Sequence, residues 1–432
     1  MRDARRLSRV LHFCRPSHQI ELQNEATMKT DVRATVNVYT PVVYDLPFPR
    51  SEYEARHARV KREMANAGAD ATLVTMPRDF SWLTGTRVDF YAAESPQWLI
   101  VWAGEPVGIV RRLEATTHRC CSFVDQWVGY PDEGPVNPYD PVQYTVKSLE
   151  QIGLADKRIG INLRVTPVEE YERLKTLLPK ARFVDFRVEQ IRVRRSAAEL
   201  ECVRRANNIN RATLAETIET IGPGWSEWDI VMHLCAGHEK RLGEEYFYSA
   251  TGATVCQVGD HMLHMHVLRT PHERKQKRVA RGDGIWIEPG IFVKTYVGCM
   301  IRTVWFGEPP QRVREALDAT HQAFDRLARV MAPGRTSHEV DAAARDYLTA
   351  AGFEMQHRSG YTANERWTDA GILSLTPGNP LVLEVGQVFH CPMHVFLPGI
   401  GYVGSSEQVV ITETGCEILG DQSVCPRRLY VK

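Results

Sequence analysis

Two similar stretches, PGWS at 223–226 and PGRT at 333–336, decide the fold that this sequence predicts. In each, a Ser or Thr is followed three residues later by an acid, Asp229 or Glu339, which is the pattern of a helix N-cap. Each predicted helix runs to a glycine and leads into a segment rich in strand formers. The spacing of 110 residues indicates two similar αβ halves about a pseudo-twofold axis, which form one sheet with helices on its outer face. We expect a ligand site in the cleft between the halves.

The chain before this repeat predicts a separate domain. Strand-like and helical segments alternate between 50 and 186, which is typical of a small α/β domain. The S-x-x-E pattern at 51–54 predicts a capping box that opens a helix, and WLTG at 82–85 predicts a turn. A long helix over 188–221 forms the predicted junction. The predicted fold class is therefore α/β (α+β), with two domains.

The predicted domain limits are 1–45, 46–190 and 191–432. The first segment carries several Arg residues before its first Glu, which fits either an Arg-rich transit peptide or an upstream extension with the true start at Met28. Because Ser is not enriched there, the extension is favoured, and we expect this segment to be disordered and outside the fold.

The composition excludes several classes of protein. The 53 basic residues equal the 53 acidic ones, so neither nucleic acid nor an anionic membrane is expected as partner. No stretch approaches the roughly 18 apolar residues of a membrane helix. The ten cysteines form no CxxC pair, which favours reduced thiols in the cytoplasm. A small molecule is the expected partner.

A histidine run lies before the strand-like stretch GIWIEPG at 284–290. If 261–266 were a strand, His264 and His266 would share one face, and a functional role or a metal is open for them. In the following stretch, Glu288 stands among strand formers, where burial of a carboxylate requires a partner.

Three further stretches carry isolated polar groups: MIRTVWF at 300–306, HRSGY at 357–361, and VFHCPMH at 388–394 followed by SSEQ at 405–408. Arg302 needs a carboxylate or a ligand in such an apolar segment. The GxGxxG match at 399–404 joins two strands without a helix, so it predicts a hairpin loop rather than a dinucleotide site.

The sequence resembles a known family, the pita-bread enzymes, which include methionine aminopeptidase, Xaa-Pro peptidases, creatinase and ectoine hydrolase. The resemblance lies in GD at 282–283, EPG at 288–290 and RT at 302–303, and it extends over nearly all of the chain from about position 50. Gly-Tyr at 360–361 and Phe-His at 389–390 are most similar to ectoine hydrolase. The resemblance implies a creatinase-like N-terminal domain and a C-terminal pita-bread catalytic domain.

The metal-dependent members of this family hold their metals with two Asp, one His and two Glu. These ligands fall on Glu288, Cys299, Tyr361, Pro392 and Ser406 of this sequence. Proline offers no side-chain ligand, and Tyr and Ser are poor ligands for a divalent metal. The resemblance therefore implies the creatinase-like branch, with no metal and no cofactor.

Hydrolysis without a metal needs a general base to activate water, and histidine suits this role. The family's catalytic histidine matches His266, with His264 as the alternative. The resemblance implies cleavage of a C–N bond in a small amidine, guanidine or amide. In that reaction Glu288 and Glu407 hold the cationic group, and Arg302 clamps a substrate carboxylate.

The other expected site residues complete the same cleft. Tyr361 and His390 donate hydrogen bonds to the developing tetrahedral oxygen or nitrogen. Trp82, Arg87 and Tyr91 lie in the segment that, in creatinase, the partner subunit contributes. The resemblance therefore implies a homodimer.

Three alternatives remain open at the level of the sequence. The first is a metal-dependent Xaa-Pro aminopeptidase or dipeptidase, and the second is a dimethylsulfoniopropionate lyase, which also relies on metal. The third is a catalytically inactive protein that binds a small molecule.

Overall fold

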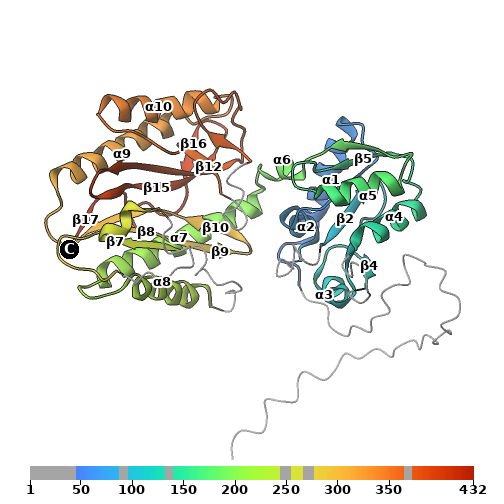
Figure 1. Ribbon diagram of the computed structural model, residues 1–432, viewed down its shortest axis with the longest axis horizontal. Coiled ribbons are helices and arrows are strands. Elements are labelled where there is room, and N and C mark those ends of the chain that lie inside the picture. The colour runs from blue at the N-terminus through green and yellow to red at the C-terminus, as the bar shows by residue number, and fades with distance from the viewer. Residues whose placement is uncertain (1–44, 87–95, 132–139, 244–253, 266–276, 364–371) are drawn as a thin grey trace, which may run out of the picture.

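The computed structural model describes residues 45–86, 96–131, 140–243, 254–265, 277–363 and 372–432. These residues form an N-terminal and a C-terminal domain, which the short helix α6 (Val188–Arg192) and the long helix α7 (Ala197–Thr220) connect (Figure 1). The long junction helix expected over 188–221 is thus two helices. Helix α6 ends at Arg192, and α7 begins after Ser196, whose side chain caps it in a capping box with Glu199.

The N-terminal domain is a six-stranded sheet in the order β4-β3-β2-β1-β5-β6. Successive residues of a strand point to opposite faces, and in β2 Leu99 and Val101 belong to one apolar cluster while Trp98 and Ile100 belong to another. Helices therefore cover both faces of this sheet. The bounds are α1 Arg50–Asn66, β1 Ala71–Val74, α2 Pro77–Thr84, β2 Trp98–Trp102, β3 Val107–Arg111, α3 Arg112–Cys121, β4 Gln126–Tyr130, α4 Pro141–Gln151, β5 Arg158–Ile161, α5 Val168–Leu177 and β6 Arg182–Asp185.

Two local predictions for this domain are wrong. Helix α1 begins at Arg50, with Pro49 as its N-cap and no side-chain cap, so Ser51 lies inside the first turn instead of capping it. The stretch at 82–85 is not an isolated turn: it is the end of α2, and Gly85 is the left-handed C-cap with φ 80°.

The C-terminal domain contains two main sheets, β17-β11-β8-β7 and β13-β12-β14-β15-β16. A bridge between Ile301 and Ser406 joins them. Figure 1 shows these strands between the pair α9 and α10 and the pair α7 and α8. The bounds are α8 Glu227–Leu242, β7 Val255–Val258, β8 Gly284–Glu288, β9 Gly290–Val293, β10 Tyr296–Cys299, β11 Arg302–Trp305, α9 Gln311–Val330, α10 Ser337–Ala350, β12 Gly360–Thr362, β13 Ser374–Leu375, β14 Val388–Leu397, β15 Gly401–Ile411, β16 Cys416–Ile418 and β17 Tyr430–Val431.

The internal repeat is present in this domain. Ser226 and Thr336 each cap a helix in a complete capping box with Asp229 and Glu339. Each capping residue also forms a bridge to a later segment, at Arg278 in the first half and Val382 in the second. The GxGxxG stretch at 399–404 joins β14 to β15 as a hairpin, as predicted.

Other features complete the fold. Residues Gly259–Leu263 form a 3₁₀ helix, so the strand considered for the histidine run is not formed there. Among the described residues, no helix has the length and apolar character needed to cross a membrane.

Strand β10 packs so closely on α7 that Gly298 admits no side chain. A Cβ at Gly298 would lie 2.4 Å from the Ala206 carbonyl carbon and 2.5 Å from the Asn207 nitrogen, both backbone atoms. We expect Gly298→Ala to lower the free energy of unfolding by about 1–3 kcal/mol, as overpacking does. Urea-induced unfolding measures this change. Gly222→Ala is the matched control, because a Cβ at Gly222 meets nothing within 4 Å; equal stability of the two variants would contradict the close packing.

Candidate active site

A pocket of about 210 Å³ lies between the two halves of the C-terminal domain. Strand β8 and Ile301 supply its wall from the first half, and β12, β14 and β15 supply its wall from the second. Its lining residues are Met265, Trp286, Glu288, Ile301, Gln356, His357, Tyr361, Pro392, His394 and Tyr402. The cleft between the halves, expected from the repeat, therefore holds a pocket.

Aromatic rings surround the His394 side chain in this pocket. The ring centroids of Trp286 and Tyr402 lie 5.5 Å and 5.6 Å from that of His394, both edge to face, and His357 stacks on His394 at 5.7 Å. Glu288, which is 6% exposed, adds a carboxylate to the same lining. Aromatic faces carry a negative quadrupole, so rings and a carboxylate together favour a bound cation.

Tyr361 is the pocket residue that connects to a buried histidine. The register of β12 and β14 pairs Tyr361 with His390, and His390 Nδ1 lies 3.0 Å from the Tyr361 hydroxyl. The other ring nitrogen, Nε2, lies 2.6 Å from Ser406 Oγ. Burial, together with smaller effects of His357, His394 and Arg358, lowers the pKa of His390 to about 3. His390 is therefore a neutral imidazole that does not line the pocket and reaches it through Tyr361.

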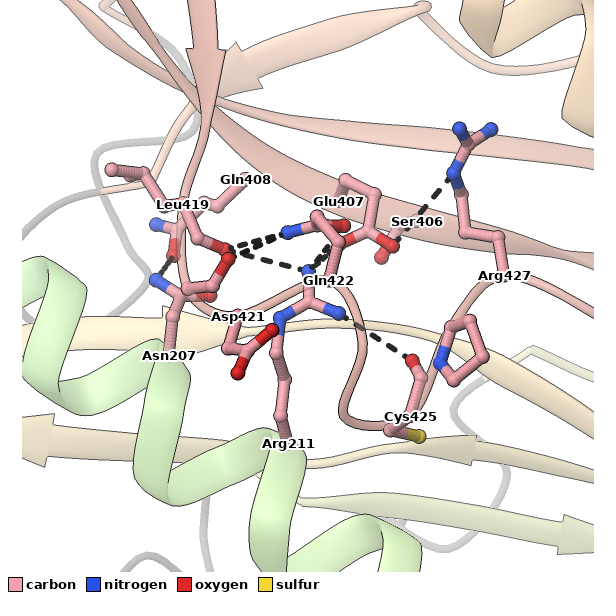
Figure 2. Close-up of polar contacts among 12 residues, drawn as sticks. Asn207, Arg211, Ser406, Glu407, Gln408, Leu419, Asp421, Gln422, Cys425 and Arg427 are labelled. Carbon is pink, nitrogen blue, oxygen red and sulfur yellow. Dashed lines mark hydrogen bonds and ion pairs between the residues drawn. The ribbon is translucent and has the colours of Figure 1, made fainter.

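Glu407 forms a buried ionic network with Arg302 and Arg211. Figure 2 shows Glu407 with Arg211 and Arg427. Arg302 Nη2 donates to Glu407 Oε1 at 2.7 Å, Arg211 of α7 donates to the other carboxylate oxygen, and all three side chains are fully buried. Arg427 Nε lies 3.8 Å from the same carboxylate. Arg302 also donates to the backbone oxygens of Ser406 and Cys425.

This network does not agree with the expected substrate-binding roles of Glu407 and Arg302. Neither is among the residues that line the pocket, and each neutralises the other. The reason is the period of two along β15: Ser406 points toward His390, so its neighbour Glu407 points the other way, to α7.

The five positions that correspond to the family's metal ligands do lie close together. Glu288, Tyr361 and Pro392 line the pocket, Cys299 shares an apolar cluster with Tyr361, and Ser406 is hydrogen-bonded to the imidazole that also bonds Tyr361.

The donors at these positions do not fit a two-metal centre. Burial raises the pKa of the Cys299 thiol well above its usual value, so the thiolate that a metal needs is disfavoured. Pro392 has no donor atom, and Ser406 is engaged by His390. In the described ranges, no group of three or more His, Cys, Asp or Glu residues is arranged to hold a metal ion.

The remaining expected site residues are placed as follows. His264 is exposed and does not line the pocket, although its neighbour Met265 does. Trp82 is 1% exposed and donates from Nε1 to Glu199 at 2.9 Å in the junction between the domains, so a substrate contact is not supported. His266, Arg87 and Tyr91 lie outside the described residues, and their roles stay predictions.

Four lining residues with aromatic rings have no role predicted from the sequence: Trp286, His357, His394 and Tyr402. One signal was available for His394, because it lies four residues after His390 and two after Pro392 in a strand, where such spacing places side chains on one face. For Tyr402 there was no signal, since its position depends on the register of the β14–β15 hairpin.

Comparison with known proteins agrees with this architecture. Residues 201–413 match Metallopeptidase family M24, and residues 56–195 match the Creatinase/Prolidase N-terminal domain. Ectoine hydrolase of Halomonas elongata is 30% identical over 411 residues, which cover 90% of this chain and 99% of the relative. An uncharacterized hydrolase/peptidase of Sinorhizobium fredii, y4tL, is 31% identical over 408 residues, which cover 89% of this chain and 97% of the relative.

Solved structures show the same fold. The dipeptidase PepE from Mycobacterium ulcerans has a TM-score of 0.74 at 23% identity, covering 89% of this chain and 99% of that one. The X-Pro aminopeptidase from Thermotoga maritima has a TM-score of 0.73 at 20% identity, covering 87% and 99%. The two domains and the pocket between the halves thus define an enzyme of pita-bread architecture. The chain belongs to metallopeptidase family M24, and the resemblance found in the sequence is confirmed.

The Glu407 network gives a prediction about stability. Glu407→Gln keeps the side-chain volume but leaves two buried guanidinium groups without their charge partner, so we expect a loss of about 3–5 kcal/mol in unfolding free energy. Urea-induced unfolding followed by circular dichroism measures it. Glu417→Gln is the control, because the Glu417–Arg204 pair is partly exposed and is expected to change stability by less than about 1 kcal/mol. Similar losses in both variants would contradict the structural role of Glu407.

Proposed function

We propose that this enzyme hydrolyses a C–N bond in a small cationic amidine, guanidine or amide, and that it does so without a metal ion. The observation that carries the proposal is the pocket in which Glu288, a buried carboxylate, lies among aromatic rings. A carboxylate in such surroundings is stabilised by a cation that enters the pocket. The negative faces of the rings also attract a cation, so they add to the preference of the pocket for a cationic ligand.

The size of the pocket supports a compact substrate. Pockets for drug-sized ligands commonly have volumes of about 300–1,000 Å³. The pocket here has about 210 Å³, which favours a small ring or a short chain over an extended peptide.

The chemistry requires two contributions from the protein, a general base and a hydrogen-bond donor. A general base takes a proton from water, and the water oxygen forms a bond to the electrophilic carbon while the π bond between that carbon and its oxygen or nitrogen breaks, with the electron pair passing to that heteroatom. Tyr361 donates a hydrogen bond to this heteroatom. When the heteroatom re-forms its double bond to carbon, the C–N bond breaks, and the leaving nitrogen takes the electron pair and the proton that the base received from water. His266 as the base remains a prediction from the sequence. The donor set supports the absence of a metal, because four of the five ligand positions hold residues that a divalent ion does not favour.

The relatives point to two substrate classes. A relative named ectoine hydrolase supports a non-peptide C–N bond, whereas the solved structures with this fold include an X-Pro aminopeptidase. We favour the first class because the side chains at the ligand positions do not suit a metal-dependent peptidase. A homodimer and a cytoplasmic location remain predictions.

Whether the activity requires a metal ion can be tested directly. We expect enzyme dialysed against EDTA to keep its activity on members of a panel that includes ectoine, creatine and other small amidines, guanidines and cyclic amides. Xaa-Pro dipeptides and dimethylsulfoniopropionate serve as competing substrates in the same panel. Loss of activity on chelation with recovery on Mn²⁺, or turnover of only the competing substrates, would contradict the proposal. Binding of panel cations without turnover of any of them would indicate an inactive binding protein.

Glu288 is expected to select the charge of the ligand. Glu288→Gln removes a charged partner worth about 1.5–3 kcal/mol, so Kd for a cationic ligand of the panel should rise about 10–150-fold. Calorimetry should show little change for a neutral ligand of the same shape. Glu308→Gln is the control, since that side chain is 81% exposed and is paired with Arg314 on the surface. Equal weakening of cationic and neutral ligands would show that Glu288 acts through shape alone.

A further inference from the structure

Ser406 fixes which nitrogen of His390 carries the hydrogen. Its hydroxyl is fully buried, and its one hydrogen-bond partner within the described part of the chain is His390 Nε2, at 2.6 Å. Burial of a hydroxyl hydrogen without an acceptor costs free energy, and the lone pair of a neutral imidazole nitrogen is the acceptor within reach here. Ser406 therefore donates to Nε2, and the imidazole hydrogen is on Nδ1.

This assignment sets the direction of the next hydrogen bond. His390 Nδ1–H donates to the Tyr361 oxygen over 3.0 Å. Because the Tyr361 oxygen accepts this bond, its own hydrogen is directed to an acceptor other than His390. Tyr361 and Glu288 are both among the residues that line the pocket. A hydrogen bond received by the phenol oxygen also makes the phenol a stronger donor, since linked hydrogen bonds polarise one another.

We propose that Ser406 and His390 are positioning residues, which orient the Tyr361 hydroxyl as a hydrogen-bond donor to the substrate atom that gains electron density. This inference rests on the proposed C–N hydrolysis. Of these three residues, Tyr361 is the one that touches substrate, and it keeps its proton throughout. We call Ser406, His390 and Tyr361 the relay, and no covalent bond forms or breaks within it.

The backbone holds the relay in a single geometry. The Ser406 nitrogen donates to the Ile301 oxygen at 3.2 Å, and Arg302 donates to the Ser406 oxygen at 2.9 Å. These bonds join both halves of the domain at the position of the relay. Two of the positions that correspond to metal ligands, Tyr361 and Ser406, are thus the two ends of one hydrogen-bonded chain.

The tautomer can be measured without any substrate. Long-range ¹H–¹⁵N correlation spectra of the full-length protein with ¹⁵N-labelled histidine distinguish the two neutral tautomers, and the spectrum of His390→Gln identifies the His390 signals. We expect the hydrogen of His390 on Nδ1 at neutral pH. A hydrogen on Nε2 would overturn the inference, because Tyr361 would then donate to His390 instead of to the substrate.

Kinetics test the function of the relay. Ser406→Ala should lower kcat by about tenfold or more with little change in KM, since the removal of a directly acting donor costs about 10²–10³. In a Tyr361→Phe background the same substitution should have no further effect. Ser405→Ala is the matched control on the same strand: its buried hydroxyl has no hydrogen-bond partner within the described residues, and kcat should stay unchanged.

The outcomes separate the two proposals. A full additional loss of kcat when Ser406→Ala is added to Tyr361→Phe would overturn the relay. If wild-type protein turns over no member of the panel, the proposed function fails, and the tautomer measurement still decides the geometry of the relay.

Discussion

The pocket depends on a buried carboxylate held between two guanidinium groups. Glu407 comes from β15 in the second half of the repeat and Arg211 from α7, which packs against β9 and β10 (Figure 2). Arg302 comes from β11 in the first half. Removing charges from water is expensive, so a fully buried set like this one requires good pairing geometry. The pairing fixes how the two sheets meet at Ile301 and Ser406, and the pocket walls follow from that contact.

The outline of the fold was accessible from the sequence because it depends on local signals. The capping boxes at Ser226 and Thr336 marked the two halves of the repeat, and both formed as predicted. The errors arose where a local signal competes with its neighbours. The S-x-x-E pattern at 51–54 failed because Pro49 starts the helix two residues earlier.

The candidate site was only partly predictable, and Glu288 and Glu407 show why. Both are carboxylates within strong strand sequences, and the sequence gives no way to decide which face of a strand meets the pocket. A shift of one residue moves a side chain from one face to the other. Here Glu288 lines the pocket. On β15, Ser406 points toward His390, and Glu407 points to the opposite side, where it pairs with Arg211 in the core. The pairing of strands that lie far apart in the sequence decides this, as at Ile301 and Ser406. No local sequence pattern predicts that pairing.

The environment of His390 restricts which group can act as the base. A general base is most effective when its pKa lies near the working pH. Burial holds the pKa of His390 near 3, and neither ring nitrogen faces the pocket, because Tyr361 and Ser406 occupy them. His390 is therefore suited to hold a hydroxyl in place and unsuited to accept a proton from water. A change of activity with pH near neutrality would therefore report the ionisation of a different group. His266, which the sequence predicts as the base, is the candidate for that group.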